Sequence, residues 1–150
     1  SNGYSLARKI AFDHAGLSAD SPVDRMSRTV GEEFLEPTRI YARPIGELLG
    51  SDLRDAVHGL AHITGGGLQE NVERILPKGL RLAVDPKGWP KPAVFDWLRD
   101  LGGVAEAEMN RVFNMGLGFV IVAAPEWADA ICDRLVALGE RPLRIGAVTS

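Results

Sequence analysis

Apolar residues recur along the chain at two spacings, one typical of helices and one typical of strands. Near the start, four apolar residues share one helical face and predict a helix over residues 4–14 that stops at Gly16. Ser1 and Asn2 precede this helix and belong to the residue types that cap helices well. Residues 17–36 are polar and broken by proline and glycine, so we expect an irregular connection there. The four apolar residues are Leu6, Ala7, Ile10 and Ala11.

From residue 57 onward, strand and helix patterns alternate. The segment 117–123 is apolar throughout, which is typical of a central strand covered on both faces. Trp127 is expected to face inward from the last helix, and Leu143 to begin the last strand. Together the patterns predict strands over 57–63, 80–85, 117–123 and 143–147, and helices over 45–49, 68–75, 92–101, 106–113 and 125–138.

The order of these elements separates the possible fold classes. Strand, helix, strand, two helices, strand, helix, strand favours an α+β fold over a fully alternating doubly wound sheet. We expect a mixed β-sheet flanked by helices, mainly on one side, with a ferredoxin-like core. A chain of 150 residues can bury a proper core as one domain, 1–150, without a disulfide or a metal.

Composition and charge narrow the classes of partner. The net charge is -3 with both signs interspersed, so a nucleic-acid partner is not expected and a small molecule is. Cys132 is the single cysteine, which excludes an internal disulfide and suits a reducing compartment; its apolar neighbours favour a place in the core. No apolar run is long enough to span a membrane and no export signal begins the chain, so we expect a cytoplasmic protein. The start at Ser1 suggests a piece of a longer protein, or a processed or engineered start.

The run from His62 to Asn71 is the most informative stretch for function. It joins an apolar strand to a helix through Gly65, Gly66 and Gly67. A helix opened in this way presents free backbone N–H groups, and glycines let an anion reach them. A phosphate site and a plain turn both remain open, because the lysine and serine or threonine of a P-loop are missing.

Polar residues on both sides of this turn are candidate ligand contacts. His62 and Thr64 project the same way if the strand continues that far, although His62 could also be satisfied by a backbone carbonyl. Asn71 lies about one helical turn beyond Gly67, where its amide could face a ligand or only solvent. Three histidines without a cysteine close to them in sequence make a poor case for zinc.

A second candidate segment links a helix to the apolar strand at 117–123. Arg111 could pair with a phosphate through its planar fork or simply lie on the surface. Asn114, followed by Gly116, could contribute to a site or only terminate a helix. Trp89 and Trp97 fit core positions. The carboxylates Glu32, Glu33 and Glu36 fit a solvated face.

Taken together, these segments closely resemble the C-terminal half of the phosphoribosylformylglycinamidine cyclo-ligase family, also called aminoimidazole ribonucleotide synthetases. The resemblance runs from the first residue almost to the last, in one order and with ordinary spacing. Its motifs are Ser1-Asn2-Gly3-Tyr4-Ser5-Leu6, Ala61-His62-Ile63-Thr64-Gly65-Gly66-Gly67 with Glu70-Asn71, Leu76-Pro77, Glu108-Met109, Arg111, Phe113-Asn114-Met115-Gly116, Gly118, Gly139-Glu140 and Ile145-Gly146.

The resemblance implies ATP-dependent closure of the imidazole ring of formylglycinamidine ribonucleotide in purine biosynthesis. Because an amide oxygen is a poor leaving group, such enzymes are expected to phosphorylate it before an internal nitrogen attacks, largely by positioning and charge neutralisation. The resemblance also implies a homodimer in which ATP and Mg²⁺ are held mainly by an N-terminal domain that this chain lacks.

For the substrate, the resemblance implies a cleft faced by the Ser1-Asn2-Gly3 loop and the His62 to Asn71 turn, supported by Asn114, that binds the ribonucleotide phosphate or the reacting amide. The full set of expected substrate-binding residues is Ser1, Asn2, Gly3, His62, Thr64, Gly65, Gly66, Gly67, Asn71, Arg111 and Asn114. No catalytic residue and no metal ligand is assigned.

Two other functions stay open. One is a domain of the related formylglycinamidine ribonucleotide synthase, against which Glu108-Met109 and the stretch from Arg111 to Gly118 weigh. The other is a non-catalytic small-molecule-binding or assembly module. Without an ATP-binding half, the isolated chain is expected to be inactive.

Overall fold

The computed structural model describes residues 3–23, 26–85 and 87–150. Ser1 and Asn2, expected to cap the first helix and to bind substrate, lie outside the described residues. The chain forms two compact units that are interleaved in sequence. The first unit comprises residues 1–38, 64–68 and 91–117, and the second comprises 39–63, 69–90 and 118–150.

The first unit begins with the helical segment that the apolar spacing predicts. Helix α1 (Tyr4–Arg8) continues into η1 (Lys9–His14), a stretch of π-helix in which the Ala15 N–H donates to the Ile10 carbonyl at 3.0 Å. The predicted span 4–14 is confirmed. Gly3, with φ of 84°, is the residue before the first helical turn, and no side chain caps that end.

Helix α2 (Val30–Phe34) occupies part of the segment expected to be irregular, so that prediction was wrong there. Its start is a capping box: the Glu32 N–H donates to Thr29 Oγ1 at 3.2 Å, and the Thr29 N–H donates to Glu32 Oε2 at 2.8 Å. The sequence signal was therefore a local cap rather than an apolar repeat. Glu33 and Glu36, expected to be solvated, both pair with Arg28.

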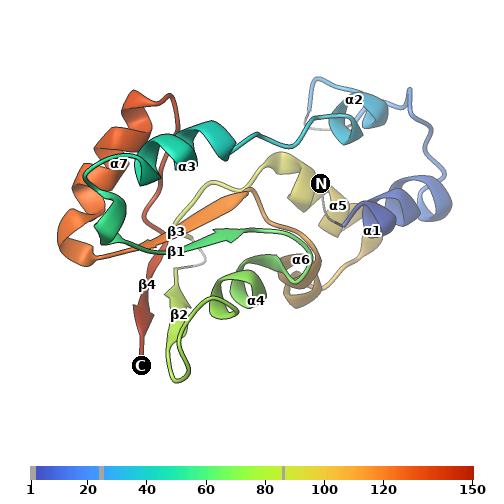
Figure 1. Ribbon diagram of the computed structural model, residues 1–150. Coiled ribbons are helices and arrows are strands. Elements are labelled where there is room, and N and C mark those ends of the chain that lie inside the picture. The colour runs from blue at the N-terminus through green and yellow to red at the C-terminus, as the bar shows by residue number, and fades with distance from the viewer. Residues whose placement is uncertain (1–2, 24–25, 86) are drawn as a thin grey trace. The chain divides into compact units, whose positions relative to one another are not determined.

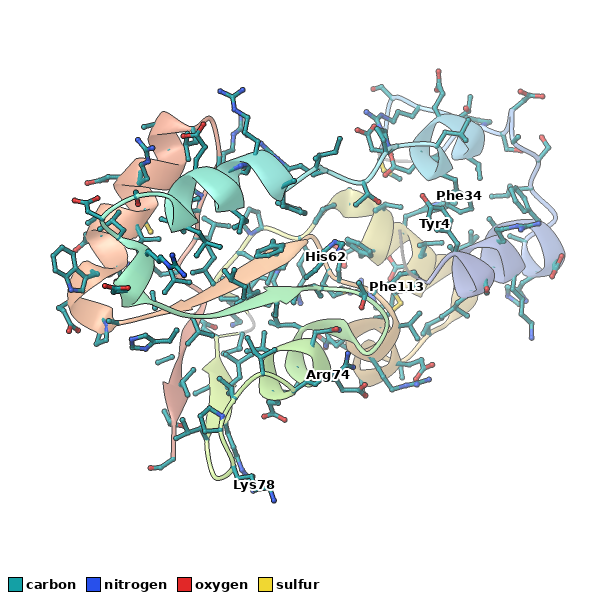
Figure 2. The ribbon with its side chains drawn as sticks, in the orientation of Figure 1. Tyr4, Phe34, His62, Arg74, Lys78 and Phe113 are labelled. Carbon is teal, nitrogen blue, oxygen red and sulfur yellow. The ribbon has the colours of Figure 1, made fainter. Side chains whose placement is uncertain are left out.

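Helices α5 (Ala93–Gly102) and α6 (Glu106–Val112) complete the first unit, close to their predicted bounds. Helix α5 packs against η1, where Gly102 leaves room for the Ile10 side chain. Phe34 makes edge contacts with three rings, at centroid distances of 6.2 Å to Tyr4, 5.9 Å to Phe12 and 6.4 Å to Trp97. The Tyr4 hydroxyl also donates to the Phe34 carbonyl at 2.7 Å (Figure 2). The helix missed in sequence thus supplies the central ring of this unit's aromatic cluster.

The second unit contains all four described strands, paired as two antiparallel two-stranded sheets (Figure 1). One sheet joins β1 (Val57–His62) to β3 (Phe119–Ala123), with a bulge between Val57 and Gly59. The other joins β2 (Arg81–Val84) to β4 (Gly146–Thr149). The α+β class predicted from sequence is confirmed.

Two helices of the second unit pack together over the sheet formed by β1 and β3. Helix α3 (Ala42–Leu49) contacts α7 (Ala128–Ala137), and residues of both helices join residues at the ends of the two strands in one apolar cluster (Figure 1). Short 3-10 turns η2 (Arg54–Ala56) and η3 (Pro125–Trp127) flank the strands, and α4 (Gly67–Glu73) follows β1 in the chain. The buried members of the cluster are Leu48, Leu53, Ala56, Ala124, Ile131 and Leu135.

Several burial predictions in this unit were wrong, for identifiable reasons. Strand β3 is half-buried and pairs only with β1 among the described strands, so it is not the central strand that its apolar run suggested. Trp127 is 49% exposed because it lies in the 3-10 turn before α7, where the helical face does not yet apply. Leu143 is 51% exposed and precedes β4. Cys132 is half-buried rather than a core residue, whereas Trp89 in this unit and Trp97 in the first unit are buried as expected.

No helix in the described ranges is long and apolar enough to cross a membrane.

The capping box of α2 provides a test of the first unit's folding. Replacing Thr29 by alanine leaves the Glu32 N–H without its side-chain acceptor, so we expect a loss of about 1 kcal/mol in the free energy of unfolding. Thr29→Ser keeps the acceptor oxygen and is the matched control. Urea unfolding followed by circular dichroism measures both; an alanine variant as stable as the serine variant contradicts the role assigned to the cap.

Candidate functional site

The glycine turn forms at the position that the sequence indicates. Strand β1 ends at His62, and α4 begins at Gly67. The Gly67 N–H donates to the Thr64 carbonyl at 3.2 Å, which closes the turn. Gly66 and Gly67 have φ of 98° and 66°, a region that L-residues with a side chain rarely adopt.

Within the first unit, the turn lies directly against the end of α6. A Cβ atom built on Gly67 would overlap the backbone carbonyl oxygen of Asn110, and would lie 3.5 Å from the Arg111 Cα. Since the obstacle is backbone rather than a movable side chain, only glycine fits. The absence of a side chain at Gly67 is therefore required by packing as well as by φ.

Gly3 is placed against the same stretch of chain. A Cβ on Gly3 would overlap the Phe113 ring and would lie 3.0 Å from Val112 Cγ1. Phe113 is buried and also contacts Phe95, with ring centroids 5.6 Å apart. Three of the predicted site elements, Gly3, the glycine turn and Arg111, therefore converge on residues 110–113.

Arg111 is engaged by a neighbouring carboxylate. Its Nε donates to Glu108 Oε2 at 2.8 Å and its Nη2 to Glu108 Oε1 at 2.6 Å, a bidentate pair one helical turn apart. The hydrogen bonds from Arg111 lower the pKa of Glu108 below its ordinary value. Both side chains are substantially exposed, which leaves the pair accessible to a solute.

Asn114 shapes the loop after α6. Its Oδ1 accepts from the Gly116 N–H at 3.0 Å, and Met115 between them has a positive φ of 50°. This is an Asx turn, in which a side-chain carbonyl replaces a backbone acceptor. The helix-ending interpretation of Asn114 is thus supported by its geometry, and its side-chain oxygen is already committed.

In the second unit, His62 is exposed at the last position of β1. Thr64 lies beyond the end of that strand, so the condition under which both side chains would extend from one strand face is not met. The strand ends at His62, the last residue that pairs with β3. The next residue, Ile63, donates its N–H to the Gly118 carbonyl at 2.9 Å.

Asn71 is 6% exposed, the buried polar side chain of the described residues. The interpretation of Asn71 as a solvated helix residue was therefore wrong. Buried amides are almost always hydrogen-bonded, and Asn71 does have an interaction partner. Its burial indicates a role in holding α4 in place.

Two residues that the sequence pattern did not single out surround the His62 ring. Phe119 stacks on it at a centroid distance of 6.0 Å and an interplanar angle of 24°, and Tyr41 meets it edge-on at 5.9 Å. Burial raises the pKa of the Tyr41 phenol above its ordinary value, so the hydroxyl stays protonated at neutral pH. The strand pairing that brings Phe119 to His62 is non-local, which left no sequence signal to read.

The described residues contain no group of three or more His, Cys, Asp or Glu side chains that could hold a metal ion.

Comparison with known proteins gives a match over the whole chain. The family model described as AIR synthase related protein, C-terminal domain, matches residues 1–150. A phosphoribosylformylglycinamidine cyclo-ligase of Trichlorobacter lovleyi is 50% identical over 150 residues, which is 100% of this chain and 42% of that protein.

Two further proteins of that name show the same pattern. The one from Syntrophotalea carbinolica is 48% identical over 99% of this chain and 41% of its own length. The one from Bacillus velezensis is 45% identical over 99% of this chain and 42% of its own length. The chain therefore spans about two fifths of the length of these curated relatives.

The close approach at Gly67 predicts a large effect of a single methyl group. Gly67→Ala adds a clash with the Asn110 carbonyl to a left-handed conformation that alone costs about 1–2 kcal/mol, so we expect a loss of at least that size in the free energy of unfolding.

Gly65→Ala is the matched control, because a Cβ on Gly65 meets nothing within 4 Å and its φ is not in the left-handed region. Urea unfolding of the two variants, with backbone NMR shifts at residues 110–111, measures the difference. Equal stability of the two variants would falsify the packing role of Gly67.

Proposed function

Because the chain belongs to the AIR synthase related family, as a C-terminal domain, we propose that it is part of a phosphoribosylformylglycinamidine cyclo-ligase of purine biosynthesis. The observation that carries the proposal is 45–50% identity, over 99–100% of the chain, to proteins that all bear that name. The reaction is the ATP-dependent conversion of formylglycinamidine ribonucleotide to aminoimidazole ribonucleotide. The shared name favours this enzyme over the related formylglycinamidine ribonucleotide synthase.

We propose that the activity belongs to the longer protein, in which an N-terminal domain holds most of the ATP and Mg²⁺. The chain spans only 41–42% of its relatives, and its described residues offer no cluster of ligands suited to a metal. Mg²⁺ binds through carboxylates and the phosphates of its nucleotide, so a domain that carries such groups is required. By the same resemblance, the intact enzyme is proposed to be cytoplasmic, with 1–150 as a single C-terminal domain. It is also proposed to be a homodimer, and sedimentation of the longer protein tests this oligomeric state.

The chain's own contribution is proposed to be substrate positioning. An amide oxygen leaves readily only after phosphorylation, and ring closure then requires the internal nitrogen to be held against the activated carbon. A ribonucleotide phosphate is anionic, and backbone N–H groups at a glycine turn can approach it closely. We therefore propose that Gly3 and the turn Thr64-Gly65-Gly66-Gly67 bind the phosphate or the reacting amide.

The other residues of the expected set are proposed to complete the substrate site. Arg111 carries a planar cation suited to phosphate, and its pairing with Glu108 keeps that cation oriented. His62 is exposed and able to donate or accept a hydrogen bond. Asn114 and Asn71 are proposed to act mainly by shaping the loop and α4, since one is committed to Gly116 and the other is buried.

A ferredoxin-like core remains our proposal for the sheet architecture. The element order supports it, while the described strands pair as two separate sheets, β1 with β3 and β2 with β4. An experimental structure in which the strands join into one mixed sheet supports the proposal, and one in which the two sheets stay separate contradicts it.

The isolated chain is predicted not to catalyse the reaction. With ATP, Mg²⁺ and formylglycinamidine ribonucleotide supplied, we expect no aminoimidazole ribonucleotide and no phosphate release, because the residues that bind ATP are proposed to lie in another domain. The full-length Trichlorobacter lovleyi relative, assayed in parallel, is the positive control. Sustained, ATP-dependent product formation by the chain alone contradicts the proposed division of labour.

Substrate binding by the chain is the second functional prediction. In isothermal titration with formylglycinamidine ribonucleotide we expect Arg111→Ala to weaken binding about tenfold or more, since hydrogen bonds to charged groups contribute about 1.5–3 kcal/mol. Arg99→Ala is the matched control, because Arg99 is also paired with carboxylates in the first unit but is not a proposed site residue.

Equal affinity of the Arg111 and Arg99 variants removes Arg111 from the site. The absence of any heat and of any shift in melting temperature with the unaltered chain contradicts a phosphate site on this chain and favours a purely structural or assembly role.

A further inference from the structure

The three rings at the end of β1 form a set that the proposed chemistry does not yet explain. His62 contacts both Phe119 and Tyr41, and Tyr41 contacts Phe119 at a centroid distance of 5.2 Å with an interplanar angle of 40°. All three residues belong to the second unit. The imidazole thus contacts two carbon rings that also contact each other. Figure 2 labels His62 on its strand.

The strand register accounts for the stacked pair. His62 and Phe119 are direct partners in the antiparallel pairing of β1 with β3, so their side chains emerge on the same face. Directly opposed residues in such a pair have Cβ atoms close enough for rings to touch. The nearly parallel His62 and Phe119 rings follow from this pairing.

Tyr41 reaches the pair from a different element and is fixed independently. It is the residue before α3, and two positions earlier Arg39 is bonded through Nη2 to Glu140 Oε2 at 3.1 Å and to the Gly139 carbonyl at 3.4 Å. These bonds tie the chain before α3 to the end of α7. Tyr41 therefore does not depend on His62 for its position.

Gly118 provides the space that Tyr41 needs. A Cβ on Gly118 would overlap the Tyr41 hydroxyl and would lie 2.8 Å from its Cζ. Because the next residue is Phe119, the same short segment carries one ring and makes room for the other. A side chain at position 118 would displace the tyrosine.

His58 shows what the same strand does to a histidine without such neighbours. It is exposed on β1 like His62, yet no ring contacts it within the described part of the chain. An exposed imidazole on a strand samples several staggered rotamers, whereas rings on two sides restrict it to few. The two histidines therefore differ in their aromatic neighbours, and also in strand pairing, since His58 lies at the bulge between Val57 and Gly59.

We propose that Tyr41 and Phe119 are positioning residues that hold the His62 imidazole in one orientation for a ligand at the end of β1. This inference rests on the proposed function, in which His62 binds the ribonucleotide. Fixing the ring before binding removes part of the entropic cost of ordering it when the ligand arrives. Neither aromatic residue needs to touch the ligand to raise its affinity.

Histidine ring NMR tests the ring contacts on which the positioning rests. The chain has three histidines, His14, His58 and His62, so their ring signals can be assigned by single substitutions. We expect the neighbouring rings to shift the His62 ring-proton resonances away from those of His58. In Tyr41→Leu and in Phe119→Leu, the His62 chemical shifts should move toward the His58 values. Tyr41→Phe keeps the aromatic ring, so the His62 chemical shifts should stay as in the unaltered chain. Gly118→Ala should act like Tyr41→Leu.

The His58 and His14 signals report whether a variant still folds, and two independent variants guard against one that does not. Unchanged His62 signals in folded Tyr41→Leu and Phe119→Leu chains overturn the proposal. So does Tyr41→Phe behaving like Tyr41→Leu, since the ring itself would then not be what positions the histidine.

Ligand affinity separates positioning from general packing. Titration with formylglycinamidine ribonucleotide should show several-fold weaker binding for Tyr41→Leu, and no further loss when Tyr41→Leu is added to His62→Ala. Equal losses in both backgrounds mean that Tyr41 acts independently of His62 and contradict the proposal. Should the unaltered chain not bind this ribonucleotide, the proposed function fails, and the NMR comparison still decides whether the two rings contact the imidazole in solution.

Discussion

The antiparallel pairing of β1 with β3 is the interaction on which the rest of the second unit depends. It sets His62 opposite Phe119, and it ends with the bond from the Ile63 N–H to the Gly118 carbonyl. Beyond that bond the two strands are no longer paired. One therefore leads into the glycine turn, and the other begins just after the loop shaped by Asn114. A slip of this register by one residue would turn His62 to the other face of the sheet.

In the first unit the corresponding constraint is the close approach of two glycines to the end of α6. Gly67 meets the Asn110 carbonyl, and Gly3 meets the Phe113 ring, so two loops from distant parts of the sequence are held against one short stretch at the end of α6. Proximity of this kind tolerates no side chain, which explains glycine at both positions without reference to a ligand. The glycine turn is therefore more than a potential phosphate cradle. Its packing would keep the backbone N–H groups in place whether or not an anion is present.

Much of the helical fold could be predicted because its signals are local. The apolar spacing of residues 4–14 and the proline before α5 gave bounds close to those observed. Helix α2 escaped because its signal was the pair Thr29 and Glu32, and such caps carry no periodicity. Pairings were not predictable, because any of several apolar strands could partner another and the choice depends on contacts remote in sequence. For that reason β3 was misjudged as central and Tyr41 was overlooked.

The candidate site divides in the same way between local and non-local information. The glycine turn and the helix end just before Asn114 follow from residue types in order, and both formed. The surroundings of each polar side chain do not follow from the local sequence. Glu108 pairs with Arg111, Asn71 is buried, and two rings flank His62. These three outcomes assign the residues different roles. A charge paired on the surface can exchange partners, a buried amide cannot, and an exposed imidazole between rings keeps its nitrogens available while losing its freedom to rotate. Among the predicted side chains, His62 therefore best combines accessibility with a defined orientation, which is what a ligand contact requires.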